Sequence, residues 1–170
     1  YKKKFNFSMN DFIELNSYHF NKDKQYKRTS PPKLKMIDLF AGTGGFTIAF
    51  TKKNKVDVVM ANDMFNKSEQ IYKHNFPNHN FIAGDLNDID NSQIPDHDIL
   101  TGGYPCQPFS IAGKQLGFKD KRANVFFKII SIIKDKKPRF VVLENVKNLQ
   151  SHDKGKTFTV VKNEIKKLGY

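Results

Sequence analysis

Apolar and polar positions follow two alternating patterns along the chain after residue 35. Short apolar runs of the kind that form buried strands lie at 36–40, 56–61, 81–83, 99–101 and 140–143. Stretches with the helical spacing of apolar residues lie between or after them, at 46–53, 67–75, 124–134 and 158–168. Strands that alternate with helices predict an α/β domain with a mainly parallel sheet that is covered on both faces.

Residues 1–35 differ from the rest of the chain in charge and pattern. They hold nine Lys or Arg and three acids, so their net charge (9 − 3 = +6) is half of the chain's net charge of +12. A capping-box pattern at Ser8 predicts a short helix after it, and a lysine-rich stretch then leads to Pro31 and Pro32. We predict a basic N-terminal extension and linker over 1–35 and a catalytic domain over 36–170. A surface extension packed on that domain is favoured over a dedicated DNA-binding arm.

Four chemically useful side chains follow the apolar runs, namely Asp63, Asp85, Cys106 and Glu144. In a parallel sheet the carboxyl ends of the strands share one edge, and open α/β folds bind ligands there. The sequence therefore predicts that these four residues converge on one site.

A glycine-rich turn, with Gly42 and Gly44, separates the first strand from the first helix. Glycines let the backbone approach a ligand, and a helix start offers free N–H groups to an anionic group. Asp63 follows 19 positions after Gly44, the spacing expected for a carboxylate that binds ribose hydroxyls. Thr47 stands where a dinucleotide fingerprint has a small residue, so a nucleoside that carries a small zwitterion fits better. The alternative is a tight turn without a ligand.

After the third run, Asp85 is placed to accept from an exocyclic amine and Leu86 to cover a base. By itself a turn-forming aspartate explains this pattern better, and only the neighbouring strand ends favour a ligand site.

The only cysteine, Cys106, lies in the run GGYPCQPFS at 102–110. A lone cysteine is usually a small buried hydrophobe, but the surrounding glycines and prolines fix backbone shape where a core strand would need side chains. Glu144 follows an apolar run, a setting in which a carboxylic acid can donate a proton; an acid paired with a lysine is the alternative. A thiolate and a protonatable carboxylate on neighbouring strand ends suit conjugate addition to an electron-poor ring.

The composition of the chain excludes several classes of protein. A single cysteine excludes a disulfide framework and a cysteine-rich zinc site, and it fits a reducing compartment. The five histidines show no close ligand spacing, so we predict that they lie on the surface and form no metal site. No apolar run reaches the roughly 18 residues that span a membrane. The positive charge attracts polyanions, of which nucleic acid is the commonest.

Three motifs in order, DLFAGTGGF at 38–46, GGYPCQPFS at 102–110 and ENV at 144–146, resemble the DNA (cytosine-5) methyltransferases of bacterial restriction–modification systems. The resemblance runs from about Met36 to Tyr170. It implies a Rossmann-like S-adenosylmethionine-dependent methyltransferase fold, truncated before the target-recognition domain. We therefore expect the catalytic part of a longer or split cytoplasmic enzyme that acts on double-stranded DNA and has little activity alone.

The resemblance also implies residue roles. Cys106 attacks C6 of a cytosine flipped out of the duplex, and Glu144 contacts N3 and the exocyclic amine. Pro105 shapes the cysteine loop and Asn145 helps to hold it. Lys114, Lys119, Lys121 and Arg122 lie in a stretch, 107–124, that resembles a mobile loop closing over DNA, and they are candidate phosphate contacts. The implied contacts to S-adenosyl-L-methionine are Phe40, Gly42, Gly44, Asp63, Met64, Asp85, Leu86 and Val125.

At Met64 the family often places an aromatic side chain over the adenine, and the adjacent Phe65 offers a substitute. Three alternatives stay open at this point. They are methylation of RNA cytosine by the same chemistry, a non-catalytic DNA-binding subunit of a split enzyme, and a nicotinamide-dependent oxidoreductase.

Overall fold

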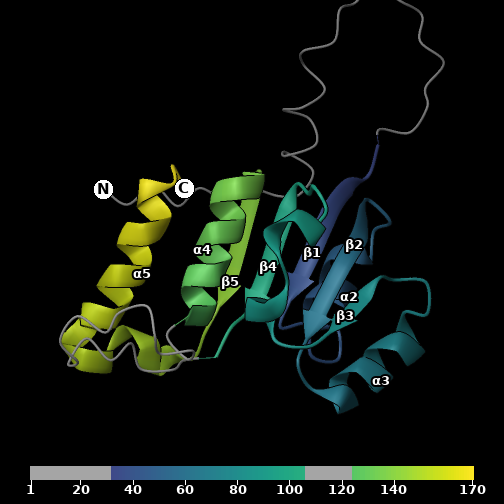
Figure 1. Ribbon diagram of the computed structural model, residues 1–170, viewed down its shortest axis with the longest axis horizontal. Helices are drawn as coiled ribbons and strands as arrows, with labels where there is room; N and C mark the ends of the chain where they lie inside the picture. The colour runs from purple at the N-terminus through teal and green to yellow at the C-terminus, as the bar shows by residue number, and fades with distance from the viewer. Residues whose placement is uncertain (1–31, 106–123) are drawn as a thin grey trace, which may run out of the picture. The chain divides into compact units, whose positions relative to one another are not determined.

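The computed structural model describes residues 32–105 and 124–170, which form a five-stranded sheet with helices (Figure 1). Every strand pairing in this part of the chain is parallel, and the strand order is β3-β2-β1-β4-β5. The strands are β1 (Leu34–Leu39), β2 (Val56–Asp63), β3 (Phe81–Ala83), β4 (Ile99–Gly103) and β5 (Phe140–Glu144). The helices are α2 (Gly45–Thr51), α3 (Asn66–Asn75), α4 (Asn124–Lys136) and α5 (Lys156–Lys167).

The predicted α/β architecture is confirmed, and each strand and helix predicted after residue 35 is present with ends shifted by at most two residues. The short helix expected after Ser8 lies outside the described residues. Leu34 and Lys35 already pair with β2. The sheet therefore begins inside the range assigned to the extension, and the division of the chain into an extension and a catalytic domain stays a prediction. None of the helices described is long and apolar enough to cross a bilayer.

Strand β1 shows why both faces of the sheet are covered. Its side chains alternate, so Ile37 and Leu39 enter one hydrophobic cluster while Met36 enters a second. The first cluster includes α4 residues, and the second includes Tyr72 of α3 and, at its margin, Phe50 of α2. A strand with apolar side chains on both faces is typical of a parallel sheet between two helical layers.

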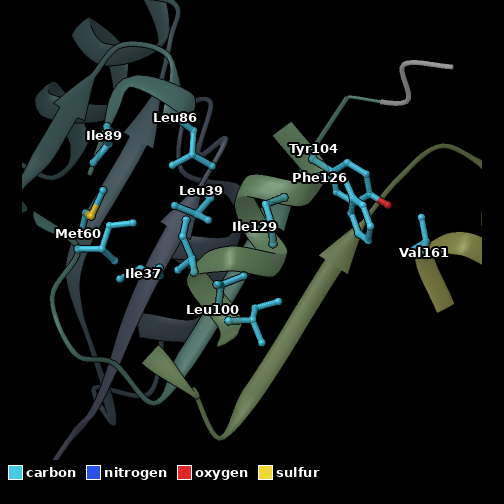
Figure 2. Close-up of a cluster of buried hydrophobic side chains, with 13 residues drawn as sticks. Ile37, Leu39, Met60, Leu86, Ile89, Leu100, Tyr104, Phe126, Ile129 and Val161 are labelled. Atoms are coloured by element: carbon cyan, nitrogen blue, oxygen red, sulfur yellow. The ribbon is translucent and has the colours of Figure 1, made fainter. Parts of the chain in front are cut away.

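Helix α4 covers the first cluster, the main core (Figure 2). Phe126, Ile129 and Ile133 recur at helical spacing and are at most 2% exposed. Burial of each such side chain stabilises the fold by roughly 2 kcal/mol, so α4 is held to the sheet mainly by this stripe.

The strand order creates a topological switch point between β1 and β4. The chain runs from β1 outward to β2 and β3, and then returns to β4 and continues outward to β5. Open α/β sheets bind ligands at the carboxyl ends of the two strands that flank such a point. Here the glycine turn follows β1, and β4 ends inside the cysteine motif at Gly103, so the glycine turn and the described start of that motif both lie at the switch point.

His97, just before β4 and outside that site, is 7% exposed, so the expectation that all five histidines lie on the surface is wrong for this residue. Its Nδ1–H donates to the Pro95 carbonyl oxygen at 2.8 Å, and Nε2 has no hydrogen-bond partner among the residues described. Burial lowers the pKa of His97 below its ordinary value of 6.5. At a pH between the His97 pKa of the unfolded chain and that of the folded chain, the unfolded chain binds a proton that the folded chain does not bind. The free energy of unfolding should therefore fall as the pH drops through this range.

Urea unfolding at about pH 7.5 and about pH 5.5 checks this expectation. The free energy of unfolding should be lower at the acid pH, and the difference should shrink in His97→Gln, which cannot titrate. An equal pH dependence in both proteins would assign the acid sensitivity to other groups.

Candidate functional site

The glycine turn after β1 has an unusual backbone. Phe40, Gly42 and Gly44 all have positive φ, at 55°, 53° and 98°. A phenylalanine rarely adopts this left-handed region, and such residues cluster at ligand-binding sites. The Gly44 N–H donates to the Ala41 carbonyl oxygen at 2.8 Å and closes the turn. The turn expected from the sequence is therefore present, and α2 begins directly after it.

Gly42 and Gly44 differ in what surrounds them. A Cβ added at Gly42 would meet no atom within 4 Å, so this backbone faces open space. A Cβ at Gly44 would lie 2.4 Å from Cε2 of Phe76. Gly44 therefore allows α2 to pack closely on the loop after α3. The predicted ligand contact of Gly42 and Gly44 stays a prediction, and Gly44 has a packing role that the sequence did not reveal.

Asp63, the last residue of β2, ties this turn to the next strand. Its Oδ2 accepts the Gly42 N–H and its Oδ1 accepts the Phe65 N–H, both at 2.9 Å. The residue is 7% exposed. An ionised carboxylate has about four acceptor positions, so two are left for ribose hydroxyls. The ribose role stays a prediction, and the structure adds that Asp63 orders the glycine turn.

Met64 and Phe65 follow Asp63 and project large apolar side chains that are 58% and 66% exposed. Adjacent exposed apolar side chains are more informative when they border a polar site than when they are scattered over a surface. A flat nucleobase is a ligand that such side chains would cover. The expected contact of Met64 with the cofactor, with Phe65 as its neighbour, stays a prediction.

Asp85 and Leu86 belong to the turn that follows β3. Asp85 Oδ1 accepts from the N–H and Nδ2 of Asn87, at 2.9 and 3.0 Å, and caps the short 3₁₀ turn η1 (Leu86–Asp88). Leu86 is 1% exposed and packs in the main core near Leu39 and Ile89 (Figure 2). The turn-forming role of Asp85 is confirmed. The prediction that the Leu86 side chain covers a base is wrong, because that side chain fills the core; only its backbone stays a predicted contact.

Glu144 ends β5 opposite Gly103 of β4. Its Oε2 lies 3.2 Å from the position that a Cβ at Gly103 would occupy, so the glycine makes room for the carboxylate. Glu144 is exposed. The expectation that residues 141–143 give this side chain apolar surroundings is therefore wrong. Its carboxylate lies instead at the open carboxyl edge of the sheet, beside the end of β4.

The cysteine segment leaves the sheet beside Glu144. Asn145 Nδ2 donates to the Tyr104 carbonyl oxygen at 2.7 Å, two residues before Cys106, so the expected hold of Asn145 on the start of this loop is confirmed. Cys106 and the residues that follow it to 123 lie outside the described residues. Val125, in the first turn of α4, is half-buried and packs against the main core. The predicted roles of Cys106 and Val125 stay predictions.

Asp38 is the functional-site residue that the sequence analysis missed. It is fully buried beneath the glycine turn, where burial raises its pKa and hydrogen bonds from Thr101 and Thr47 oppose that effect. Thr101 Oγ1 donates to Asp38 Oδ1, and the N–H and Oγ1 of Thr47 donate to Oδ2. A charged residue inside an apolar strand run was the available signal.

A surface hollow of about 550 Å³ lies elsewhere, between α4 and η2 (Asn91–Gln93). It is lined by Asp90, Asn91, Ser92, Asp96, Lys128, Ser131, Asp135 and Lys136. No side chain from the carboxyl ends of the strands lines it, so it is separate from the site described above.

Comparison with known proteins decides the family. A model of the family "C-5 cytosine-specific DNA methylase" matches residues 34–170. The chain belongs to this family. Its sequence is 48% identical over 145 residues to the type II methyltransferase M1.ScrFI of Lactococcus lactis subsp. cremoris. The matched region covers 85% of this chain and 37% of that protein. It is 51% identical over 139 residues to the type II methyltransferase M.HaeII of Haemophilus aegyptius, covering 80% of the chain and 42% of that protein.

The fold of this C-5 cytosine methylase chain is shared with the solved structure of S. pombe Dnmt2 methyltransferase. The TM-score is 0.64 at 23% identity, over 80% of this chain and 41% of the other. The expected Rossmann-like methyltransferase fold is thereby confirmed. The chain spans about 40% of the length of the curated relatives that it matches.

Proposed function

We propose that this chain is the catalytic part of a DNA cytosine-5 methyltransferase of a type II restriction–modification system. It would transfer a methyl group from S-adenosyl-L-methionine to C5 of a cytosine flipped out of double-stranded DNA. One observation carries the proposal in this family member: the open glycine turn after β1 and the exposed Glu144 carboxylate flank the segment that leads to Cys106, at the switch point of the sheet.

The residues described fit the methyl donor. Gly42 presents open backbone for its amino-acid end, Asp63 retains acceptor positions for its ribose, and Met64 offers an apolar cover for its adenine. Asp85 accepts both bonds from Asn87 through Oδ1, so we propose Oδ2 as the acceptor for the exocyclic amine. When bound, S-adenosyl-L-methionine supplies an electrophilic methyl group on a sulfonium.

The residues of the chain would make the cytosine reactive toward that group. The Cys106 thiolate forms a bond from Sγ to C6, and the displaced electron pair moves onto the ring, where Glu144 holds the proton at N3. C5 would thereby become nucleophilic toward the methyl group that the donor supplies, and the donor sulfur would leave as a neutral thioether. Loss of the C5 proton then returns the electron pair and releases the thiolate. Base flipping is needed because C6 is inaccessible within the stacked duplex.

Base selection would come from outside this chain. We propose that double-stranded DNA is the substrate and that the remaining part of the enzyme lies on the same polypeptide or on a second subunit, in the bacterial cytoplasm. The net charge of +12 supports a polyanionic partner. Methylation of RNA cytosine and a non-catalytic DNA-binding role are the alternatives to this proposal.

A duplex with 5-fluorocytosine at the target position tests the proposal, with the C-terminal region of a relative supplied in trans or by fusion. Fluorine at C5 cannot leave as a proton does, so the enzyme should stay bound through Cys106 when S-adenosyl-L-methionine is present. A denaturing gel should show the adduct with the unaltered chain and none with Cys106→Ser. Trapping on RNA alone would favour the RNA alternative, and trapping by Cys106→Ser would contradict the assigned nucleophile.

A further inference from the structure

A chain of side-chain hydrogen bonds runs from the loop after α3 to Asp38 in β1. His79 Nδ1 lies 3.2 Å from Tyr72 Oη, which lies 2.8 Å from Thr47 Oγ1. Thr47 Oγ1 in turn lies 2.8 Å from Asp38 Oδ2. We call these four residues the hydroxyl relay. His79 is half-buried, whereas the other three members are 0% exposed.

The number of protons on each side chain determines the donor in every hydrogen bond of the hydroxyl relay. Asp38 accepts three hydrogen bonds, from the Thr47 N–H, Thr47 Oγ1 and Thr101 Oγ1, so the single hydroxyl proton of Thr47 points to Asp38. Tyr72 must then donate to Thr47, because two oxygens 2.8 Å apart need a proton between them. Tyr72 has no further proton, so His79 must carry its proton on Nδ1 and donate to Tyr72. One arrangement satisfies every contact, and it selects the Nδ1–H tautomer of His79.

The buried end of the relay lies against the start of α2. Gly44 is the N-cap of this helix and makes no side-chain cap. Asp38 Oδ2 accepts the Thr47 N–H at 3.1 Å and so takes the place of a cap residue from within the sheet. The packing of Phe76 excludes a side chain at Gly44, which is why the cap has to come from elsewhere. The relay therefore holds the helix start that follows the glycine turn.

We propose that the hydroxyl relay positions the glycine turn, and that Thr47 and Tyr72 are positioning residues for the S-adenosylmethionine site. Only the identity of the ligand rests on the proposed function. The proposal has two consequences for the protein without ligand. The hydroxyl of Thr47 determines the tautomer of His79, and it steadies the backbone at Gly42 and Gly44.

Thr47→Val tests the first claim, because valine keeps the shape of threonine and removes only the hydroxyl. Tyr72 then loses its acceptor and should donate to His79 Nδ1, which moves the histidine proton to Nε2. Imidazole nitrogen chemical shifts report the tautomer; burial lowers the pKa of His79, so a pH above 7 keeps the ring neutral. Thr51→Val is the matched control, since the one bond of Thr51 Oγ1 to a residue that the structure describes goes to the Thr47 carbonyl oxygen within α2, at 2.7 Å.

Amide hydrogen exchange tests the second claim. The exchange rates of the Gly42 and Gly44 amides should rise about fivefold in Thr47→Val relative to Thr51→Val, as expected for the loss of one hydrogen bond. Thr47→Ser keeps a hydroxyl and should restore both readouts. An unchanged His79 tautomer in Thr47→Val, or equal exchange in the two valine variants, would overturn the proposal. Failure of the proposed function would show instead as a lack of trapped DNA, with both nuclear magnetic resonance readouts unaffected.

Discussion

Glu144→Gln should lower DNA methylation by the reconstituted enzyme roughly 100- to 1,000-fold, which is the range for loss of a general acid or of a charge-stabilising group. The glutamine has the same shape, but it cannot exchange a proton with N3 of the cytosine. The Glu144 side chain is exposed at the end of β5, so the free energy of unfolding should change by less than about 0.5 kcal/mol. Transfer of labelled methyl groups to duplex DNA and urea unfolding measure the two effects.

The control for this variant is Glu164→Gln, the same change on α5. Glu164 forms an ion pair with Lys167 at 2.6 Å within its own helix and is remote in sequence from the strand-end motifs. It should retain methylation within about twofold, because a surface pair of this kind contributes little. If Glu144→Gln retained more than a tenth of the activity, a different residue would have to stabilise the ring.

Gly44→Ala should destabilise the fold by about 3 kcal/mol, because two costs coincide at this residue. Its φ of 98° is unfavourable for any residue with a Cβ, and that atom would overlap the Phe76 ring at 2.4 Å. Gly42→Ala is the matched variant with a φ of 53° and open space around it. It should cost only about 1 kcal/mol, from backbone strain alone.

Urea unfolding of the two alanine variants gives the comparison directly. Gly42→Ala should stay folded and bind S-adenosylhomocysteine more weakly, since the new methyl group would enter the space proposed for the ligand. Equal destabilisation by both substitutions would mean that Phe76 moves aside, and that the close packing of α2 is not a constraint on residue 44.

Much of the site could be predicted because its residues lie at the ends of strands. Asp63 and Glu144 end apolar runs, and a parallel sheet brings such ends to one edge whatever the packing above them. The side chain of Leu86 was mispredicted because its position after a strand says nothing about which way it points. Its place is set by Leu39 and by α4, which are distant in the sequence.

Asp38 was missed for a related reason. A charge within an apolar strand is ambiguous until its partners are known, and Thr101 lies 63 positions away. Burial alone would make such a carboxylate costly, and only the three donors that converge on it make the position stable.

By itself, the order of apolar and polar residues determined the alternation of strands and helices and the parallel sheet, and three short motifs indicated the family to which the chain belongs. These features depend on local periodicity and on short motifs, which can be read from consecutive residues. Only the tertiary structure decided that Gly44 packs while Gly42 stays open, that Leu86 faces the core, and that Asp38 caps α2. Each of these outcomes depends on contacts between segments far apart in the chain, and such contacts exist only once the sheet and its helices have assembled.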